Sequence, residues 1–556
     1  MTEIKNFHET ELTGETTSDM PKIHQQSSVQ DVGQGQMMVA DAAGEFEENK
    51  LLKQGLHQRH IQMIALAGAI GTGLFLSSGQ AIHRAGPLGA FLGYLVMGSV
   101  SGAVCLAIGE MGTLVPLNGG IIRYADYFVD PALAFADGIN IVYSDIVSIP
   151  AEIVAAAVLV QYWSDINSAV WITIFGVLMV ATALLFVRVY GEVEFGFSML
   201  KILLIVGCNL MALVITCGGG SNHQTIGFQY WRNPGALVQY LGIGGSLGRF
   251  LGVWASMNNA LYAYSGIENI TVAAGETRCP RQAIPKAAKR IFIRILLFYV
   301  ISIFMVGLVI PSDDPDLEKH GGAAGSPFVI AATRAGIKVV PSIINAVVIT
   351  SAWSSGNSSV LGGTRTLIGL AMNGKAPKVF IRLNRFSIPW VCVSLFGVFM
   401  CLGYMSLSSS ANTVFNWLQD LVSITTLTNW MTILVTYLRF FYGCKKQGIA
   451  RSSLPWHTPF QPYISWAALT MLTLLLITGG FKTFIRGQWD DESFVSSYIN
   501  IPLFAILYFG YKFVRGTKNV PLEDIPIQPF IDYANNNPEP LPKPKRGLQK
   551  LNFLWD

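Results

Sequence analysis

The segment GAIGTGLFLSSG, residues Gly68–Gly79, lies in the first apolar run of the chain. Four glycines, a threonine and two serines interrupt a segment that otherwise reads as a membrane helix. Each glycine costs a helix about 1 kcal/mol relative to alanine, and in lipid every backbone group freed by a break needs another partner. The break predicts either backbone groups that bind a ligand or close helix packing through small residues.

The composition predicts an all-α integral membrane protein. Only 13% of the residues are charged and 51% are hydrophobic, whereas a soluble domain carries about 25% charged residues. Twelve apolar runs are long enough to cross a hydrocarbon core of about 30 Å. They are Gln62–Ile82, Pro87–Ile108, Ala134–Trp163, Val170–Val187, Phe195–Thr216, Phe250–Ala274, Ile291–Ile310, Ser342–Ala371, Pro389–Tyr404, Val414–Tyr437, Tyr463–Gly479 and Tyr498–Phe513.

The sequence gives no indication of a metal, a cofactor or a nucleic-acid partner. The net charge is only +4, and the seven cysteines form no CxxC pair and read as small buried residues. The spans contain no HExxH, no GxSxG placed on a turn and no His–Asp pairing, so we do not expect an enzyme.

The basic residues predict the orientation in the membrane. They gather after the sixth, eighth and tenth spans, whereas PSDDPDLEKHGG and RGQWDDE, on the other side, are acidic or mixed. The positive-inside rule places these basic links, and both termini, in the cytoplasm. We expect residues 1–55 to be a disordered cytoplasmic tail, 56–515 the membrane domain and 516–556 a cytoplasmic C-terminal tail. That last segment is either flexible or docks on the body or recruits sorting and ubiquitination machinery.

A second break occurs in the sixth span, at YAYSGIENITVAAG, residues 262–275. The two interrupted spans lie five apart, so they cross the membrane in opposite directions. Interrupted spans at matching positions of two oppositely oriented halves indicate an inverted-repeat transporter with its site at the midplane. The fold class is therefore twelve helices in a five-plus-five inverted repeat, with discontinuous first and sixth helices.

Several ionisable residues within the spans are candidates for function, because charges in a bilayer are costly. Glu268 follows the second break and is either a proton carrier or gate, or a protonated acid that bridges helices. Glu152 shares one face of the third span with Asp145 and with Asp137, which we expect to be solvated near the cytoplasmic end. Lys201 of the fifth span either reaches the interface or is held inside the bundle.

Three further residues have two interpretations each. Glu110, at the end of the second span, belongs to an inner gate or contacts a cytoplasmic basic group as a cap. Tyr262 and Tyr264 flank the second break, where they cover the site or make ordinary aromatic packing contacts.

Several motifs together resemble the fungal amino acid permeases of the amino acid–polyamine–organocation superfamily, over residues 50–520. They are RHIQMIALAGAIGTGLFLSSG, AGPLGAFLGY, IGEMGTLVP, YGEVEF, IGFQYWRNPGA, GETRCPRQAIPKAAKRIF and SAWSSGNSSVLGGTRTLIGLAMNGKAPKVF. Two others, FYVISIFMVGLVIPSDDPDL and SPFVIAATRAGIKVVP, look most similar to the dicarboxylic amino acid permease branch.

The resemblance implies a role for each candidate residue. The substrate α-carboxylate would bind the backbone of Ile70, Gly71, Thr72 and Gly73. The α-ammonium would bind carbonyls of Tyr264, Ser265 and Gly266, with Tyr262 as the aromatic gate. Glu268 and Glu152 would match the glutamates of the sixth and third spans, and Lys201 the lysine that replaces sodium.

The implied function is proton-driven import of L-amino acids, acidic or broadly neutral, across the plasma membrane by alternating access. Its partners are the amino acid, protons and the lipid bilayer, with a ubiquitin ligase and sorting machinery at the tails. The alternatives are a sensor that does not transport, and an exchanger or exporter of an amino-acid-derived metabolite on the same fold.

Overall fold

The structure of the protein is a computed structural model. It describes residues 70–115, 120–184, 187–220, 223–269, 280–319, 326–384, 388–536 and 538–539, except the side chains of 187–191, 269, 280, 291–295 and 318–319. Every regular element in these ranges is a helix, which confirms the all-α fold class. The predicted N-terminal tail and the first part of the first span lie outside the described residues.

Each predicted span corresponds to a helix or to a short series of helices. In chain order these are η1 (Gly73–Ser77) with α4 (Ser78–Leu114) for the first two spans, α6 (Pro131–Val160), α7 (Ser168–Ala183), α8 (Val187–Thr216), α9 (Gly245–Tyr264) with η4 (Ile267–Asn269), α11 (Pro280–Val309), α14 (Val340–Met372), α15 (Trp390–Phe399) with η7 (Met400–Leu407), α16 (Ala411–Lys446), α17 (Tyr463–Thr478), and α18 (Asp491–Tyr498) with α19 (Asn500–Arg515).

Short helices occupy the connections and the C-terminal region. They are α5 (Ile121–Phe128), η2 (Trp231–Gly235), η3 (Tyr240–Gly242), α12 (Pro315–Lys319), α13 (Pro327–Arg334), η6 (Lys378–Ile381), η8 (Arg451–Ser453), η9 (Phe481–Phe484) and α20 (Ile527–Asn536).

Length and apolar composition alone qualify six helical segments of the described chain to cross a membrane. They are Gly73–Leu114, Pro131–Val160, Glu192–Thr216, Trp390–Leu407, Ala411–Lys446 and Asp491–Arg515. The first of these segments contains two predicted spans. They are separated by a bend in α4, where Gly86 adopts a left-handed φ of 77° and is followed by Pro87. The α14 helix is absent from the six although it has 33 residues, since its SSGNSS stretch makes it more polar.

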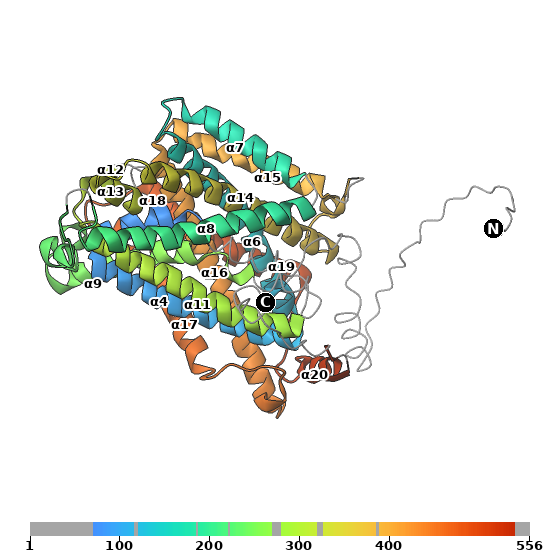
Figure 1. Ribbon diagram of the computed structural model, residues 1–556. Coiled ribbons are helices and arrows are strands. Elements are labelled where there is room, and N and C mark those ends of the chain that lie inside the picture. The colour runs from blue at the N-terminus through green and yellow to red at the C-terminus, as the bar shows by residue number, and fades with distance from the viewer. Residues whose placement is uncertain are drawn as a thin grey trace, which may run out of the picture.

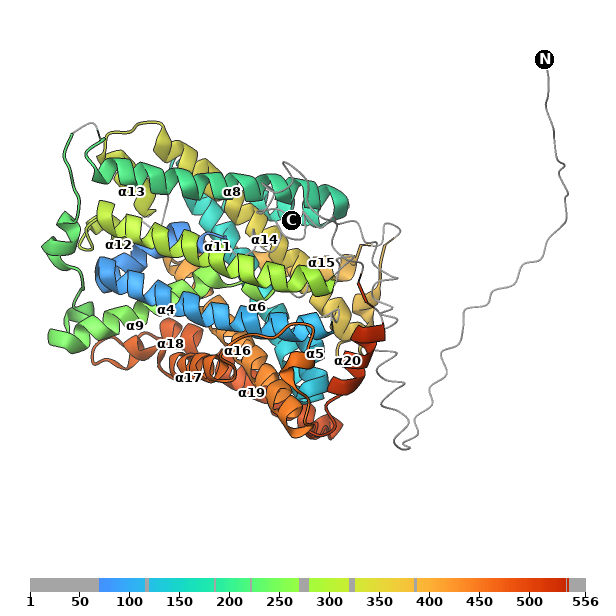
Figure 2. The same cartoon turned by 60° about the horizontal axis from the view of Figure 1, so that its bottom comes forward.

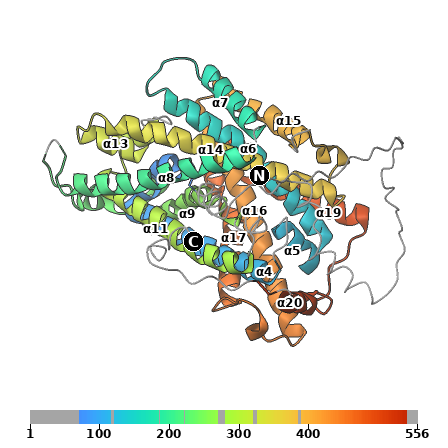
Figure 3. The same cartoon turned by 45° about the vertical axis from the view of Figure 1, so that its right-hand side comes forward.

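The helix pairs that pack together follow the predicted repeat. α9 packs on η1 and α4, α11 packs on α4, and α6 packs on α14, so spans one, two and three each contact the span five positions later. Figures 1 and 2 show α4 and α11 running side by side along their length. The fourth and ninth spans also meet, because α7 lies beside α15 (Figures 1 and 3).

The breaks in the first and sixth spans are present in the structure. Ile70–Thr72 are not helical, and the chain enters α4 through the π-helical turn η1. The α9 helix ends at Tyr264, after which Ser265 is extended and Gly266 has a φ of 88°. A Cβ at Gly73 would lie 2.8 Å from Cα of Ala263, so the two breaks pack directly against each other.

The described part of the C-terminal tail docks on the body. Phe530 of α20 is fully buried and contacts the rings of Tyr127 and Phe128 on α5. Gln447, just past the end of α16, donates hydrogen bonds to the carbonyls of residues 522, 523 and 525. Figure 2 shows α20 lying against the end of the bundle beside α5. Of the alternatives for this tail, docking on the body is the one the described residues show.

Candidate functional site

Glu152 of α6 lies against the break in the first span. Its side chain is only 3% exposed, and a Cβ at Gly71 would lie 3.0 Å from its Oε1. The hydroxyl of Tyr262 donates to the same oxygen at 3.5 Å. Thr72 and Ser355 are further polar neighbours of this carboxylate. The structure therefore brings Glu152, the first break and Tyr262 together at one place.

The two tyrosines at the second break have different surroundings. Tyr262 lies 3.4 Å, hydroxyl to hydroxyl, from Thr72, and its ring packs on Phe415. Tyr264 points elsewhere, because its hydroxyl donates to the carbonyl of Tyr94 at 3.2 Å and its ring packs on Tyr94 and Tyr299. The side chain of Tyr264 makes packing contacts, whereas the hydroxyl of Tyr262 reaches Thr72 and Glu152 beside the first break.

Lys201 of α8 is held inside the bundle. The residue is completely buried, and its Nζ donates to Oγ of Ser354 at 2.9 Å. Ser354 donates in turn to Oε1 of Glu194 at 2.5 Å, while Glu152 also interacts with the lysine. This burial excludes the alternative that Lys201 reaches the interface.

The α14 helix supplies further contacts to the first break and connects it to the lysine. Ser351 donates to the carbonyl of Ile70 at 3.2 Å, and Oγ of Ser355 would lie 3.2 Å from a Cβ at Gly71. One turn of small hydroxyl residues thus faces both the non-helical backbone of the first span and the cluster around Lys201.

Glu268 lies in a second polar cluster. Nε1 of Trp430 on α16 donates to its Oε2 at 3.1 Å, and Asn429 and the backbone of Gly266 are also polar neighbours. Asp137 interacts with Glu268 and with Thr432. The expectation that Asp137 is solvated was wrong: it is completely buried, because α16 packs over this face of α6.

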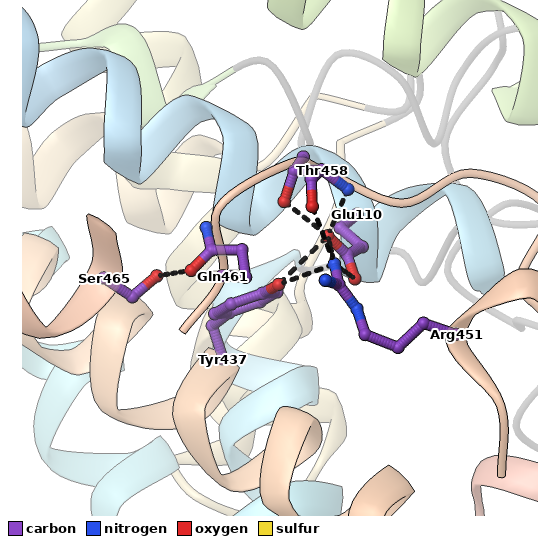
Figure 4. A network of polar contacts seen from close by, with 6 residues as sticks. All are labelled: Glu110, Tyr437, Arg451, Thr458, Gln461 and Ser465. Carbon is purple, nitrogen blue, oxygen red and sulfur yellow. Dashed lines mark hydrogen bonds and ion pairs between the residues drawn. The ribbon is translucent and has the colours of Figure 1, made fainter. Parts of the chain in front are cut away.

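Glu110, near the C-terminal end of α4, is at the centre of a third polar cluster (Figure 4). Nη2 of Arg451 contacts its Oε1 at 2.8 Å and its Oε2 at 3.0 Å. The hydroxyl of Tyr437 donates to Oε2 at 3.0 Å, and the amide of Thr458 donates to it at 2.8 Å. Glu110 is 1% exposed, so its charge is compensated by an ion pair and several hydrogen bonds. The predicted contact with a basic group is present.

The chemistry of these clusters suits binding and proton exchange. Within the ranges that the structure describes, no three His, Cys, Asp or Glu residues are arranged to hold a metal ion. The first cluster combines non-helical backbone, hydroxyl groups, two carboxylates and one ammonium group. Backbone N–H groups that precede a helix favour a carboxylate ligand, and carbonyl oxygens of a break can accept from an ammonium group.

Sequence reasoning missed Glu194, Ser354 and Arg451 as partners in these clusters. Glu194 precedes Lys201 by seven residues, which places both on one face of a helix, so this spacing could have indicated the pair. Ser354 and Arg451 carry no such signal, because each meets its partner only through tertiary packing.

Comparison with known proteins gives the family. The profile of the family described as "Amino acid permease" matches residues 60–520. The chain is 36% identical over 501 residues to the "Dicarboxylic amino acid permease" of Saccharomyces cerevisiae, covering 89% of this chain and 82% of that protein. It is 38% identical over 476 residues to the "Proline-specific permease" of Emericella nidulans, covering 84% of this chain and 86% of that protein.

A solved structure shares the fold. A variant of the Eremococcus coleocola manganese transporter superposes with a TM-score of 0.54 at 15% identity, covering 88% of this chain and 97% of that one. The named relatives are transporters, which agrees with the expectation that the chain is not an enzyme. With its apolar spans, its paired helix breaks and a family match over most of its length, this chain is a multi-pass membrane protein that belongs to the amino acid permease family.

Proposed function

We propose that the protein imports L-amino acids by proton symport with alternating access. The observation that carries this proposal is the position of Glu152, whose carboxylate lies against Gly71 at the first break and within reach of the Tyr262 hydroxyl. A titratable group at that place can respond to the substrate, to Lys201 and to the opening of the site together.

In this proposal the zwitterion bridges the two breaks. The N–H groups at Ile70–Gly73 hold the α-carboxylate, and the carbonyls of Tyr264–Gly266 hold the α-ammonium. Tyr262 closes over the substrate, and Lys201 takes the place that a sodium ion has in sodium-coupled transporters. Glu152 and Glu268 carry or gate the proton, and the Glu110 cluster closes the cytoplasmic side.

The cellular setting is also part of the proposal. The protein acts in the plasma membrane with both termini in the cytoplasm, as the basic links after the even-numbered spans favour. Lys5, Lys22, Lys50 and Lys53 of the N-terminal tail offer sites for a ubiquitin ligase and the sorting machinery; they lie outside the described residues.

Uptake of radiolabelled amino acids by a permease-deficient yeast strain tests this function. Uptake is compared at external pH of about 5 and about 7.5, with and without a protonophore, because a symporter depends on the proton gradient. Stimulation by acid and loss with the protonophore are the expected results. No uptake of any amino acid from protein shown to be at the cell surface would favour the sensor.

The substitutions Glu152→Gln and Glu268→Gln test the proton role. Each keeps the shape of the side chain and removes its titration, so we expect acid stimulation of uptake to fall at least about tenfold. Glu492→Gln, at an exposed position at the start of α18, is the matched control. Full acid-stimulated uptake by both variants, at wild-type surface levels, would remove these glutamates from the mechanism.

A further inference from the structure

A polar cavity of 820 Å³ lies at the opposite end of the bundle from the Glu110 cluster. Asn412 and Asn416, at the start of α16, line it, whereas Tyr437 of the Glu110 cluster lies near the end of the same helix. The orientation predicted from the basic links places this cavity on the extracellular side. We refer to this cavity as the vestibule.

The lining of the vestibule is rich in positive charge. Arg84 from α4, Arg249 from α9 and Lys482 from η9 all line it, although these residues are far apart in the sequence. His83 adds an imidazole, and Asp313 is the one carboxylate among the described residues that line the cavity. Clefts lined by one sign of charge concentrate ligands of the opposite sign.

Two carboxylates lie behind the lining, so together with Asp313 the carboxylates here equal the three cations in number, but most of them are not on the cavity surface. Asp420 interacts with Arg84 and Lys482, and Asp490 interacts with Lys482. Asp314, next to the lining residue Asp313, instead forms an ion pair with Arg334. Neither Asp420 nor Asp490 lines the cavity. A ligand inside it therefore meets the cations first.

A chain of hydrogen bonds holds Arg84 in the cavity wall. Nη1 of Arg84 donates to Oδ1 of Asn259 at 3.3 Å, and Nδ2 of Asn259 donates to Oε1 of Gln80 at 3.3 Å. Nε2 of Gln80 then donates to Oδ1 of Asn416 at 2.7 Å. A guanidinium group has five N–H donors, so Arg84 can bind a carboxylate while it keeps the bond to Asn259.

The central site offers no comparable group for a second carboxylate. Lys201 is the one Lys or Arg residue that is completely buried in the described part of the chain, and Ser354, Glu194 and Glu152 already surround it. A substrate with a negatively charged side chain would add a charge beside these two carboxylates. Selection of such a substrate needs cations elsewhere on its path.

We propose that Arg84, Arg249 and Lys482 form an outer binding site for the side-chain carboxylate of an acidic amino acid. This inference rests on the proposed import function and extends it to the substrate class. The site raises the concentration of aspartate and glutamate at the entrance and orients them with the side chain towards the cations. The outer site neither concentrates nor orients a neutral amino acid in this way.

The test compares L-glutamate with L-glutamine, which differ in charge but hardly in size. Uptake kinetics are measured for the wild type, Arg249→Gln, Lys482→Gln and the double variant, with Arg249→Lys as the conservative variant. Arg486→Gln is the control, because Arg486 is exposed, lies four residues from Lys482 and does not line the cavity. Binding of both amino acids to the purified full-length protein is measured in parallel.

The expected result is specific to charge. The double variant should raise KM and Kd for glutamate about fivefold or more and leave those for glutamine unchanged, while Arg249→Lys and Arg486→Gln behave as the wild type. Raising the salt concentration should weaken glutamate binding to the wild type and not to the double variant. Salt screens the attraction between exposed charges, and at physiological ionic strength the screening length is about 8 Å.

Two results would overturn the outer site. One is an equal change, or no change, for glutamate and glutamine in the double variant; the other is wild-type protein that binds glutamate no better than glutamine at low salt. Failure of the import function would look different, as an absence of uptake of any amino acid by wild-type protein at the surface. The binding measurement still decides the outer site in that case.

Discussion

Gly71 is the residue on which the proposed central site most directly depends. It leaves room between the first break and α6, where even one added carbon would come within 3.0 Å of Glu152 Oε1 and 3.2 Å of Ser355 Oγ. Such separations are too short for a carbon and an oxygen without movement of the neighbours. The glycine thus keeps the carboxylate close to the non-helical backbone.

Replacement of Gly71 by valine should abolish amino acid uptake, because the new side chain displaces Glu152 and fills the space beside the break. Uptake kinetics and surface fluorescence of a tagged protein measure the effect. Gly207→Val is the matched control, since a Cβ there meets nothing within 4 Å. Unchanged substrate affinity in Gly71→Val would show that the glycines serve helix packing instead.

The ends of α4 and α16 are joined through the Glu110 cluster. Arg451, from the short helix η8, forms an ion pair with the carboxylate of Glu110 near the end of α4, and the hydroxyl of Tyr437 on α16 donates to the same carboxylate. Removal of one partner of a buried ion pair is costly because the other charge stays buried. The packing of these helix ends therefore depends on the pair.

Substitution Arg451→Gln should open this end of the bundle and lower the melting temperature. We expect the free energy of unfolding to fall by roughly 2–4 kcal/mol. Glu110 keeps three hydrogen bonds, from the Tyr437 hydroxyl and from the Thr458 amide and hydroxyl, but its charge loses its ion-pair partner. Thermal unfolding in detergent measures the loss, and a cysteine probe on this face measures the opening. Glu110→Gln combined with Arg451→Gln should cost less than the sum of the single changes; strict additivity would argue against the pair.

At the scale of the whole molecule, the C-terminal segment ties several helices together. The amide of Val520 donates to the carbonyl of Val129 at 2.9 Å, and the backbone amide of Arg281, at the start of α11, donates to Glu539 at 2.7 Å. The guanidinium of Arg281 also donates to the carbonyl of Ala534. Residues 520–536 and 538–539 thus connect the link between α5 and α6, the end of α16 and the start of α11.

Replacement of Phe530 by alanine should detach this segment from α5. The fully buried ring leaves a cavity, and such changes cost about 3–5 kcal/mol in a packed core. Thermal stability of the tagged protein, followed by size-exclusion chromatography, measures the loss. Asn535→Ala, at an exposed position of the same helix, should leave the thermal stability unchanged. An equally small effect of both substitutions would mean that α20 adds nothing to stability.

Local sequence features were sufficient to predict the membrane helices and the two breaks in them. Hydropathy sets which segments are helical in lipid, and glycine, serine and proline interrupt a helix through local backbone preferences, so both breaks could be read directly. The candidate residues at the breaks were found for the same reason, since a charge or a glycine in an apolar run stands out without knowledge of its neighbours.

Which of these candidate residues lie together depends on packing between helices that are distant in the sequence. Helical periodicity places Asp137, Asp145 and Glu152 on one face, yet Asp137 is surrounded by packing against α16, and Glu152 by the first break and α14. The partners Glu194, Ser354 and Arg451, the docked C-terminal segment and the cationic vestibule all join residues distant along the chain. Burial and charge compensation are properties of such three-dimensional neighbourhoods, which local sequence patterns do not encode.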